Sequence, residues 1–115
     1  MSINNDRVGY FPAELFTNLK AGDRAGWGGG TIAIDAPSPQ MGSGLFPDEN
    51  FYHAGYFRKI SYQNETGSPC YGPDKFSVEE FNDVPKCYGV DYYEEQKEPY
   101  GFSLQFGGPG GNCNA

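Results

Sequence analysis

The sequence predicts an all-β fold, and two features of its composition support this prediction. The chain has 115 residues, among them 17 glycines and 9 prolines, which separate short runs rich in Tyr, Phe, Val and Ile. Such punctuation is typical of short strands joined by tight turns. Aromatic residues make up 17% of the chain, and this content argues against disorder because aromatic side chains supply buried area.

The length of the chain suits one domain. A chain of this size can bury a modest core, but it is too short for two domains. Residues 1–6 are polar and are expected to be frayed, whereas residues 7–115 are expected to form a single β domain.

The only helix that we expect is short and lies near the N-terminus. Arg7–Phe11 is expected to be a strand, and Pro12 can occupy the first position of a helix because that position needs no amide donor. Residues 12–19 place apolar side chains on one face over about two turns, and Gly22 ends the helix.

Four later segments are expected to be strands. Gly26–Ile34 becomes a strand after its glycines. Phe51–Tyr62 is the longest candidate, and both of its faces carry aromatic residues, so one face can pack on a core while the other lines a groove. Cys87–Tyr93 and Gly101–Phe106 complete the set, whereas residues 63–82 are rich in turns and are expected to lie on the surface.

Charge and hydropathy exclude two kinds of partner. The formal net charge is −7 and only 8 residues are Lys or Arg, so the chain has no basic stripe that could release counterions from nucleic acid. No apolar stretch reaches 18 residues, so no membrane-spanning segment is expected. The N-terminal residues also lack the basic and apolar regions of a signal peptide.

A set of motifs in a fixed order extends over nearly the whole chain. They are VGYFPAELF at 8–16, WGG at 27–29, QMGSGLFPDE at 40–49, AGYFR at 54–58, and the closing runs CYGV at 87–90 and FGGPGGNC at 106–113. Together these motifs resemble the neprosin-type domain of secreted plant peptidases.

This resemblance implies an extracellular antiparallel β-sandwich, of which the chain would be the C-terminal part of a two-sheet, jelly-roll-like domain. It also implies a glutamic endopeptidase that cuts next to proline at acid pH. Such an enzyme needs two carboxyl groups, because one activates water while the other polarises the carbonyl or protonates the leaving amine. Neighbouring carboxyls do not ionise together easily, so the pair works at low pH.

The resemblance fails at the residues that would carry this reaction. One family glutamate belongs to the half of the domain that precedes this chain, and the other follows the WGG motif, where this sequence has Gly30. We therefore expect an incomplete or catalytically inactive form. Asp48 and Glu49 are weak substitutes, since neighbours on an extended segment point to opposite faces and a role in a turn suits them better.

The motifs also indicate which residues would line a cleft. Those residues are Trp27, Gly28, Gly29, Tyr56 and Arg58. A second hypothesis is accordingly a secreted binding module that holds proline-rich peptides or wall polysaccharides on its aromatic side chains. His53 is the only histidine and is expected to be a packed or surface residue, and we expect neither a metal nor another cofactor.

The cysteines and one sequon are further marks of secretion. The resemblance implies a disulfide between Cys87 and Cys113, whereas Cys70 is free, pairs outside the chain or competes with Cys113 for Cys87. Asn64 begins an Asn-Glu-Thr glycosylation sequon in an expected surface turn. Half a sandwich would also expose an apolar sheet face, so self-association is expected.

Overall fold

The structure is a computed structural model that describes residues 2–3, 6–7, 24–63 and 67–113. Antiparallel strand pairs make up nearly all of its regular structure. Within the described ranges the one helical element is a single 3-10 turn, η2 (Lys75–Ser77). The all-β prediction is thus confirmed, while the helix expected over residues 12–19 lies outside the described residues.

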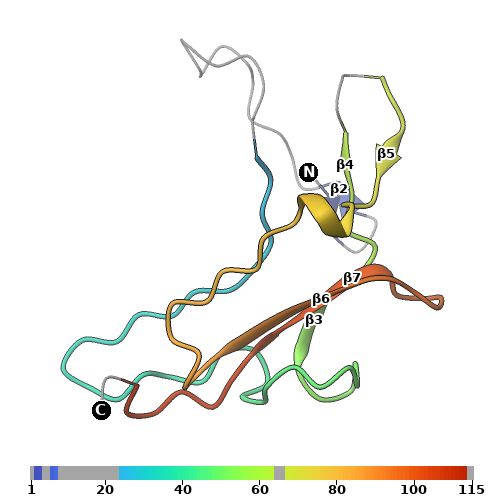
Figure 1. Ribbon diagram of the computed structural model, residues 1–115. Coiled ribbons are helices and arrows are strands. Elements are labelled where there is room, and N and C mark those ends of the chain that lie inside the picture. Colours follow the sequence, from blue (N-terminus) through green and yellow to red (C-terminus); the bar gives the residue numbers. More distant parts are fainter. Residues whose placement is uncertain (1, 4–5, 8–23, 64–66, 114–115) are drawn as a thin grey trace, which may run out of the picture.

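The centre of the molecule is a three-stranded antiparallel sheet with the order β3 (Gly55–Phe57), β7 (Gly101–Gly107), β6 (Gly89–Gln96) (Figure 1). β6 and β7 form a hairpin, in which the Tyr100 amide closes the turn by donating to the Lys97 carbonyl over 3.0 Å. The two strands expected at the C-terminal end are therefore present.

The first strand of this hairpin is longer than expected. It continues through the charged residues as far as Gln96, with a β-bulge between Tyr92 and Glu94. Glu94 has a φ of 61° at this irregularity. An extra residue in a bulge bends a strand and turns its side chains, which here lets the charged end of β6 follow its partner to the turn.

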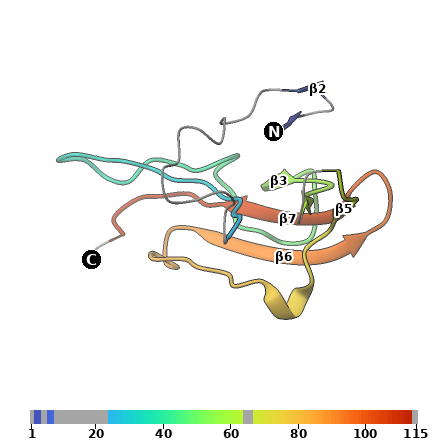
Figure 2. The ribbon, with the colours of Figure 1, turned by 90° about the horizontal axis from the view of Figure 1, so that it is seen from above.

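Two shorter strand pairs lie outside the central sheet. β1 (Ser2–Ile3) pairs with β2 (Asp6–Arg7). The sequence predicts residues 1–6 to be frayed and a strand to begin at Arg7, and the rest of that expected strand lies outside the described residues. β4 (Tyr62–Gln63) pairs with β5 (Cys70–Tyr71) in a hairpin that extends away from the central sheet (Figures 1 and 2). The described strands form no second sheet facing the first, so the sandwich stays a prediction.

The long strand expected over Phe51–Tyr62 is wrong. Only Gly55–Phe57 and Tyr62–Gln63 are strands, and residues 51–53 form a turn. The reason is local, because the Asn50 side chain accepts a hydrogen bond from the Tyr52 amide over 2.9 Å. Asn and Asp side chains that bond nearby backbone in this way favour turns over strands.

The strand expected over Gly26–Ile34 is also wrong. Its residues have no strand pairing in the structure, and Ile32 and Ile34 are 86% and 81% exposed. A strand is stabilised by a hydrogen-bonded neighbour and by burial of one face. Among the described residues this segment has neither, so the alternation of its side chains is not enough to fix a strand.

The buried core is small. Its apolar members are Ala54, Ile60, Cys87, Tyr88 and Leu104. Two polar side chains of β7, Ser103 and Gln105, are fully buried as well. A small core with buried polar groups makes individual hydrogen bonds important for the fold.

Candidate functional site

The central sheet has two unlike faces, because side chains alternate along each strand. Leu104 and Phe106 of β7 share one face with their cross-strand partners on β6, Tyr92 and Val90. We call this side the groove face. Gln105 lies on the opposite side, which we call the loop face because the loop 46–53 covers it.

An open groove of about 1490 Å³ lies over the groove face. Its floor consists of the four apolar side chains of that face. One wall is formed by residues 24–31 and the other by residues 77–84, which Figure 1 draws in blue and in yellow to orange. Trp27 on the first wall is half-buried, so the groove combines apolar surface with an aromatic side chain.

The glycines of the first wall differ in the space around them. A Cβ added to Gly29 would lie 2.9 Å from the Met41 sulfur and 3.1 Å from the Phe106 ring, whereas at Gly28 and Gly30 it would meet nothing within 4 Å. Gly29 thus allows close packing of the wall on the sheet. Gly30 lines the groove with room for a side chain.

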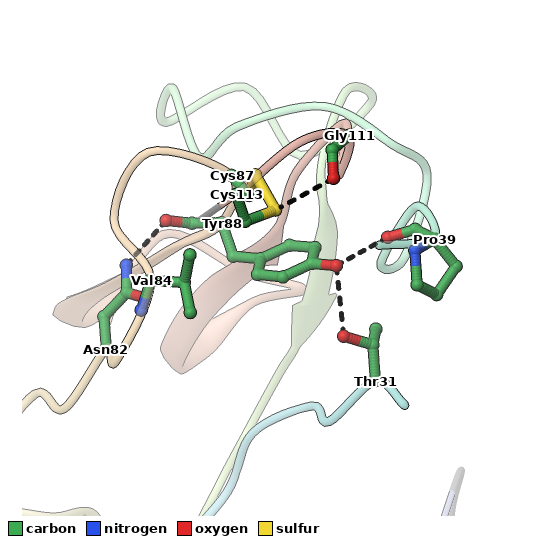
Figure 3. The surroundings of a disulfide bond; sticks show 8 residues. All are labelled: Thr31, Pro39, Asn82, Val84, Cys87, Tyr88, Gly111 and Cys113. Carbon is green, nitrogen blue, oxygen red and sulfur yellow. Dashed lines mark hydrogen bonds between the residues drawn. A yellow bond between two sulfur atoms is a disulfide. The ribbon is translucent and has the colours of Figure 1, made fainter. Parts of the chain in front are cut away.

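Tyr88 connects the two walls of the groove through hydrogen bonds (Figure 3). Its hydroxyl accepts a hydrogen bond from Thr31 Oγ1 over 3.1 Å and donates one to the Pro39 carbonyl over 2.7 Å. Its backbone carbonyl accepts a hydrogen bond from Asn82 Nδ2 over 2.6 Å. One buried residue thereby connects the first wall to the second.

The disulfide that the resemblance implies is present beside Tyr88. Cys87 is bonded to Cys113, with a Cα–Cα distance of 5.7 Å, as Figure 3 shows. The bond attaches the glycine-rich C-terminal run to the start of β6. Cys70 is exposed and forms no disulfide with another described residue.

Gln105 organises the loop face. Its Oε1 accepts hydrogen bonds from the Asp48 and Glu49 amides, over 3.2 Å and 2.9 Å, and from the Tyr93 hydroxyl over 2.6 Å. Its Nε2 donates to the Asn50 carbonyl over 2.8 Å. A single buried amide therefore fixes the backbone of three successive loop residues.

Asp48 and Glu49 do not face each other as a catalytic pair would. Asp48 Oδ1 accepts from the Asn50 amide over 3.0 Å, and its Oδ2 lies 2.5 Å from His53 Nδ1. The hydrogen bond with His53, followed by the one from Asn50, lowers the pKa of the Asp48 carboxyl. Glu49 takes up a φ of 69°, and both residues lie in a turn on the loop face.

The pKa values of Asp91 and Tyr93 are raised, whereas the pKa of Asp48 is lowered. Burial raises the pKa of the Asp91 carboxyl, and the charges of Glu80 and Glu49 raise it further. Burial also raises the pKa of the Tyr93 hydroxyl, which therefore stays a hydrogen-bond donor toward Gln105 over the physiological range.

The other two predicted cleft residues lie away from the groove. Tyr56 packs edge-to-face against Phe51 and Tyr100, with ring centroids 5.3 Å and 5.6 Å away. Arg58 Nη1 donates to the Pro99 carbonyl over 3.3 Å. Of the five predicted cleft residues, the structure brings together only the three of the Trp-Gly-Gly motif, which line the groove.

Sequence reasoning missed Gln105, Tyr88 and Glu80. Glu80 lines the groove, and its Oε1 accepts a hydrogen bond from the Tyr92 amide over 2.6 Å. All three act through contacts between distant parts of the chain, which a single sequence does not display. The one available signal was the alternation on the last strand, which places Gln105 with Ser103 on the side opposite to Phe102, Leu104 and Phe106.

Three remaining features bear on cofactors and location. The described residues contain no group of three His, Cys, Asp or Glu side chains that could hold a metal ion. Among the same residues no helix is long and apolar enough to cross a membrane. Asn64, the start of the sequon, lies outside the described ranges.

Comparison with known families identifies the origin of the motifs. A family model described as Neprosin matches residues 1–109, nearly the whole chain. This match confirms the resemblance predicted from the ordered motifs. No solved structure matches the chain.

Proposed function

The chain belongs to the Neprosin family, and we propose that it holds an extended proline-containing peptide in its groove without cutting it. The family link makes a peptidase-related function the starting point. Proline next to the cleaved bond is what the motif resemblance implies for the family's substrates. We propose that the chain binds the same class of peptide without cleaving it.

The observation that carries the proposal is Gly30. It lines the groove at the position where the resemblance places a catalytic glutamate, and a Cβ there would meet nothing within 4 Å. Glycine supplies no carboxyl group to activate water or to protonate a leaving amine. The apolar floor and the half-buried Trp27 nevertheless remain available to pack against a ligand.

Other carboxyl groups are poorly placed to replace the missing one. Asp48 and Glu49 lie on the loop face, on the far side of the sheet from the groove floor. Glu79, Glu80 and Asp83 lie on the second wall, and Glu80 is bonded to the backbone of β6. The family motifs contain none of these three residues, so no motif marks two of them as a catalytic pair.

We further propose that the protein is secreted. The Cys87–Cys113 disulfide supports this location, because structural disulfides persist in oxidising compartments and are rare in the cytosol. Expression in a secretory system should therefore give more oxidised, soluble protein than expression in a reducing cytosol. Equal yield and equal melting temperature from both would contradict the proposal.

A cleavage and binding assay tests the function directly. A proline-containing peptide of about ten residues is incubated with the protein between about pH 3 and 6, and binding is measured by calorimetry. We expect saturable binding and no cleavage products. Cleavage at any of these pH values would overturn the proposal, and the variants Asp48→Asn and Glu49→Gln would then show whether the loop face is responsible.

The Gly30→Glu variant sharpens this assay. The new side chain has room in the groove, and its carboxylate would be desolvated by a bound peptide. Binding should therefore weaken at pH 6 relative to pH 3.5, across the ordinary glutamate pKa of about 4.3. Tyr52→Glu adds the same charge at a side chain that is 91% exposed, away from the groove lining, and should not change this ratio.

A second candidate function is binding of wall polysaccharide on the loop face. Its support is the cluster of Phe51, Tyr56, Tyr93 and Tyr100, in which Phe51 stacks on Tyr100 at 3.9 Å and Tyr56 stays 41% exposed. Exposed aromatic rings can stack on sugar rings. Retention on a wall-glycan column that Tyr56→Ala abolishes and Tyr52→Ala leaves intact would favour this function.

We also propose that two copies of the chain associate. Several large apolar side chains of the described residues are exposed to solvent, and extensive exposed apolar surface favours association. They are Ile32, Ile34, Leu45, Phe46, Tyr52, Tyr56, Tyr62, Tyr71, Phe76 and Phe81. Sedimentation velocity should show a mass that rises with concentration, and a constant monomer mass up to about 100 μM would contradict this proposal.

A further inference from the structure

The outer edge of β6 is covered by side chains instead of a neighbouring strand. β6 lies at one edge of the central sheet. The Tyr92 amide on its free side donates to the Glu80 carboxylate over 2.6 Å. The Tyr88 carbonyl, just before the strand begins, accepts from the Asn82 side chain over 2.6 Å.

The order of these two contacts is that of an antiparallel pair, although they are two residues apart on the covering segment and four apart between Tyr88 and Tyr92. Glu80 meets Tyr92 and Asn82 meets Tyr88, so the covering segment runs opposite to β6. Residues two apart on an extended segment point the same way. The segment thus runs alongside the edge and bonds the Tyr92 amide and the Tyr88 carbonyl through a carboxylate and a side-chain amide. Its backbone contributes only at the turn before β6, where the Val84 carbonyl accepts from the Tyr88 amide over 3.1 Å.

The surroundings of this edge carry excess negative charge. Glu79 and Asp83 flank the covering segment, and Glu94 and Glu95 lie further along β6. Lys75 Nζ lies 3.8 Å from Glu94. A strand edge within an acidic surface favours an incoming chain that carries positive charge.

We propose that the β6 edge binds an extended, lysine- or arginine-bearing peptide by strand addition, with Glu80 exchanging the Tyr92 amide for the cation of the ligand. This inference rests on the proposed function, because Glu80 and Tyr92 also line the groove. It adds the charge of the preferred ligand and the backbone groups that the ligand meets.

The exchange conserves the hydrogen bonds of the edge. A carbonyl of the incoming strand replaces the Glu80 carboxylate at the Tyr92 amide, and an incoming amide replaces Asn82 at the Tyr88 carbonyl. Main-chain bonds of this kind supply affinity in strand addition, while side chains supply specificity. The freed Glu80 carboxylate then forms an ion pair with the ligand, so the covering residue becomes a recognition residue.

The alternative is that Glu80 only protects the edge. Charged side chains on edge strands commonly prevent pairing with other chains. The two roles differ in their consequences, since a protective residue would oppose every incoming strand, whereas a recognition residue favours a cationic strand over a neutral one.

The experiment compares two proline-containing peptides of about ten residues, identical except that one carries two lysines in place of two glutamines. Binding is measured by calorimetry, and the backbone amide of Tyr92 is followed by NMR. Glu80→Gln keeps an oxygen acceptor for the Tyr92 amide but removes the charge. Glu79→Gln removes the same charge from the neighbouring residue, whereas the bond to the Tyr92 amide belongs to Glu80.

We expect the lysine peptide to bind more tightly than the neutral one and to shift the Tyr92 amide. Glu80→Gln should reduce its affinity about threefold to fivefold, which is the range of an exposed ion pair, and Glu79→Gln should have a smaller effect. Equal binding of both peptides, or tighter binding by Glu80→Gln, would overturn the inference while leaving the proposed function intact. If neither peptide binds, the proposed function itself fails.

Discussion

The two faces of the central sheet use the same strands in opposite ways. On the loop face, Gln105 makes four hydrogen bonds and the loop 46–53 closes over the sheet. On the groove face, Leu104 and Phe106 remain the floor of an open groove. Its two walls are connected by Tyr88, which lies beside the Cys87–Cys113 disulfide. The comparison shows that the motif at residues 40–49 serves both faces, because Asp48 and Glu49 lie on the closed face while Met41 lines the open groove in which we propose that the ligand binds.

This difference separates family identity from activity. The motif on the loop face is complete and its backbone is fixed by a buried amide. The groove face has kept Trp27 and its glycines but carries Gly30 where a carboxyl group would be needed. Under the proposed function, the chain keeps the family's packing while Gly30 supplies no catalytic carboxyl group.

The largest expected effect comes from removing the disulfide. The double variant Cys87→Ala/Cys113→Ala releases a loop with a sequence separation of 26, which corresponds to about 3.5 kcal/mol of unfolding free energy. Chemical denaturation should show this loss of stability. Peptide binding should weaken as well, because Cys113 of the disulfide lines the groove. A variant with unchanged stability would show that the closing loop is held by its other contacts.

Gln105→Leu should have the next largest effect, and it acts on the other face. The change removes the acceptor of the Asp48 amide and of the Tyr93 hydroxyl and the donor to the Asn50 carbonyl, whereas the Glu49 amide keeps the Tyr93 hydroxyl as an acceptor. At about 1 kcal/mol for each lost bond, the free energy of unfolding should fall by about 3 kcal/mol. Ser103→Ala removes the other fully buried polar side chain of β7, whose Oγ makes no hydrogen bond with the described residues, and serves as the control. Equal losses in both variants would argue against the hydrogen-bonding account.

The smallest expected effect is the pH dependence of the Asp48–His53 contact. Because the folded protein lowers the pKa of Asp48 below its ordinary value of 3.8, the contact stabilises the fold above that value and is lost as the pH falls through the folded pKa. The difference in melting temperature between the native chain and Asp48→Asn should thus be present at pH 6 and fade below about pH 4. A difference that persists at low pH would contradict this assignment.

The sequence predicted the parts of the fold that depend on neighbouring residues. The β6–β7 hairpin could be predicted because two runs of β-forming residues flank a short turn. The strands expected at 26–34 and 51–62 were wrong for different reasons. The first lacks a pairing partner among the described residues, and the second is broken where Asn50 bonds the Tyr52 amide.

The site was less predictable than the hairpin. Trp27, Gly28 and Gly29 were expected to line a cleft and do line the groove, whereas Tyr56 and Arg58 belong elsewhere because the alternation assumed for one long strand does not extend across the turn. Apart from the Asn82–Tyr88 contact, which spans 6 residues, the side-chain hydrogen bonds of Gln105, Tyr88 and Glu80 described above span 12 to 57 residues. Contacts at such distances depend on the three-dimensional fold and leave no periodic pattern.

The central claim, that the open face holds the ligand, is tested most directly by mapping backbone amides during a titration with a proline-containing peptide. We predict shifts at Gly28, Gly30 and Val90 on the groove side, with Asn50 and Tyr56 on the loop side unchanged. Shifts confined to Asn50 and Tyr56 would contradict the account and place the binding site on the loop face.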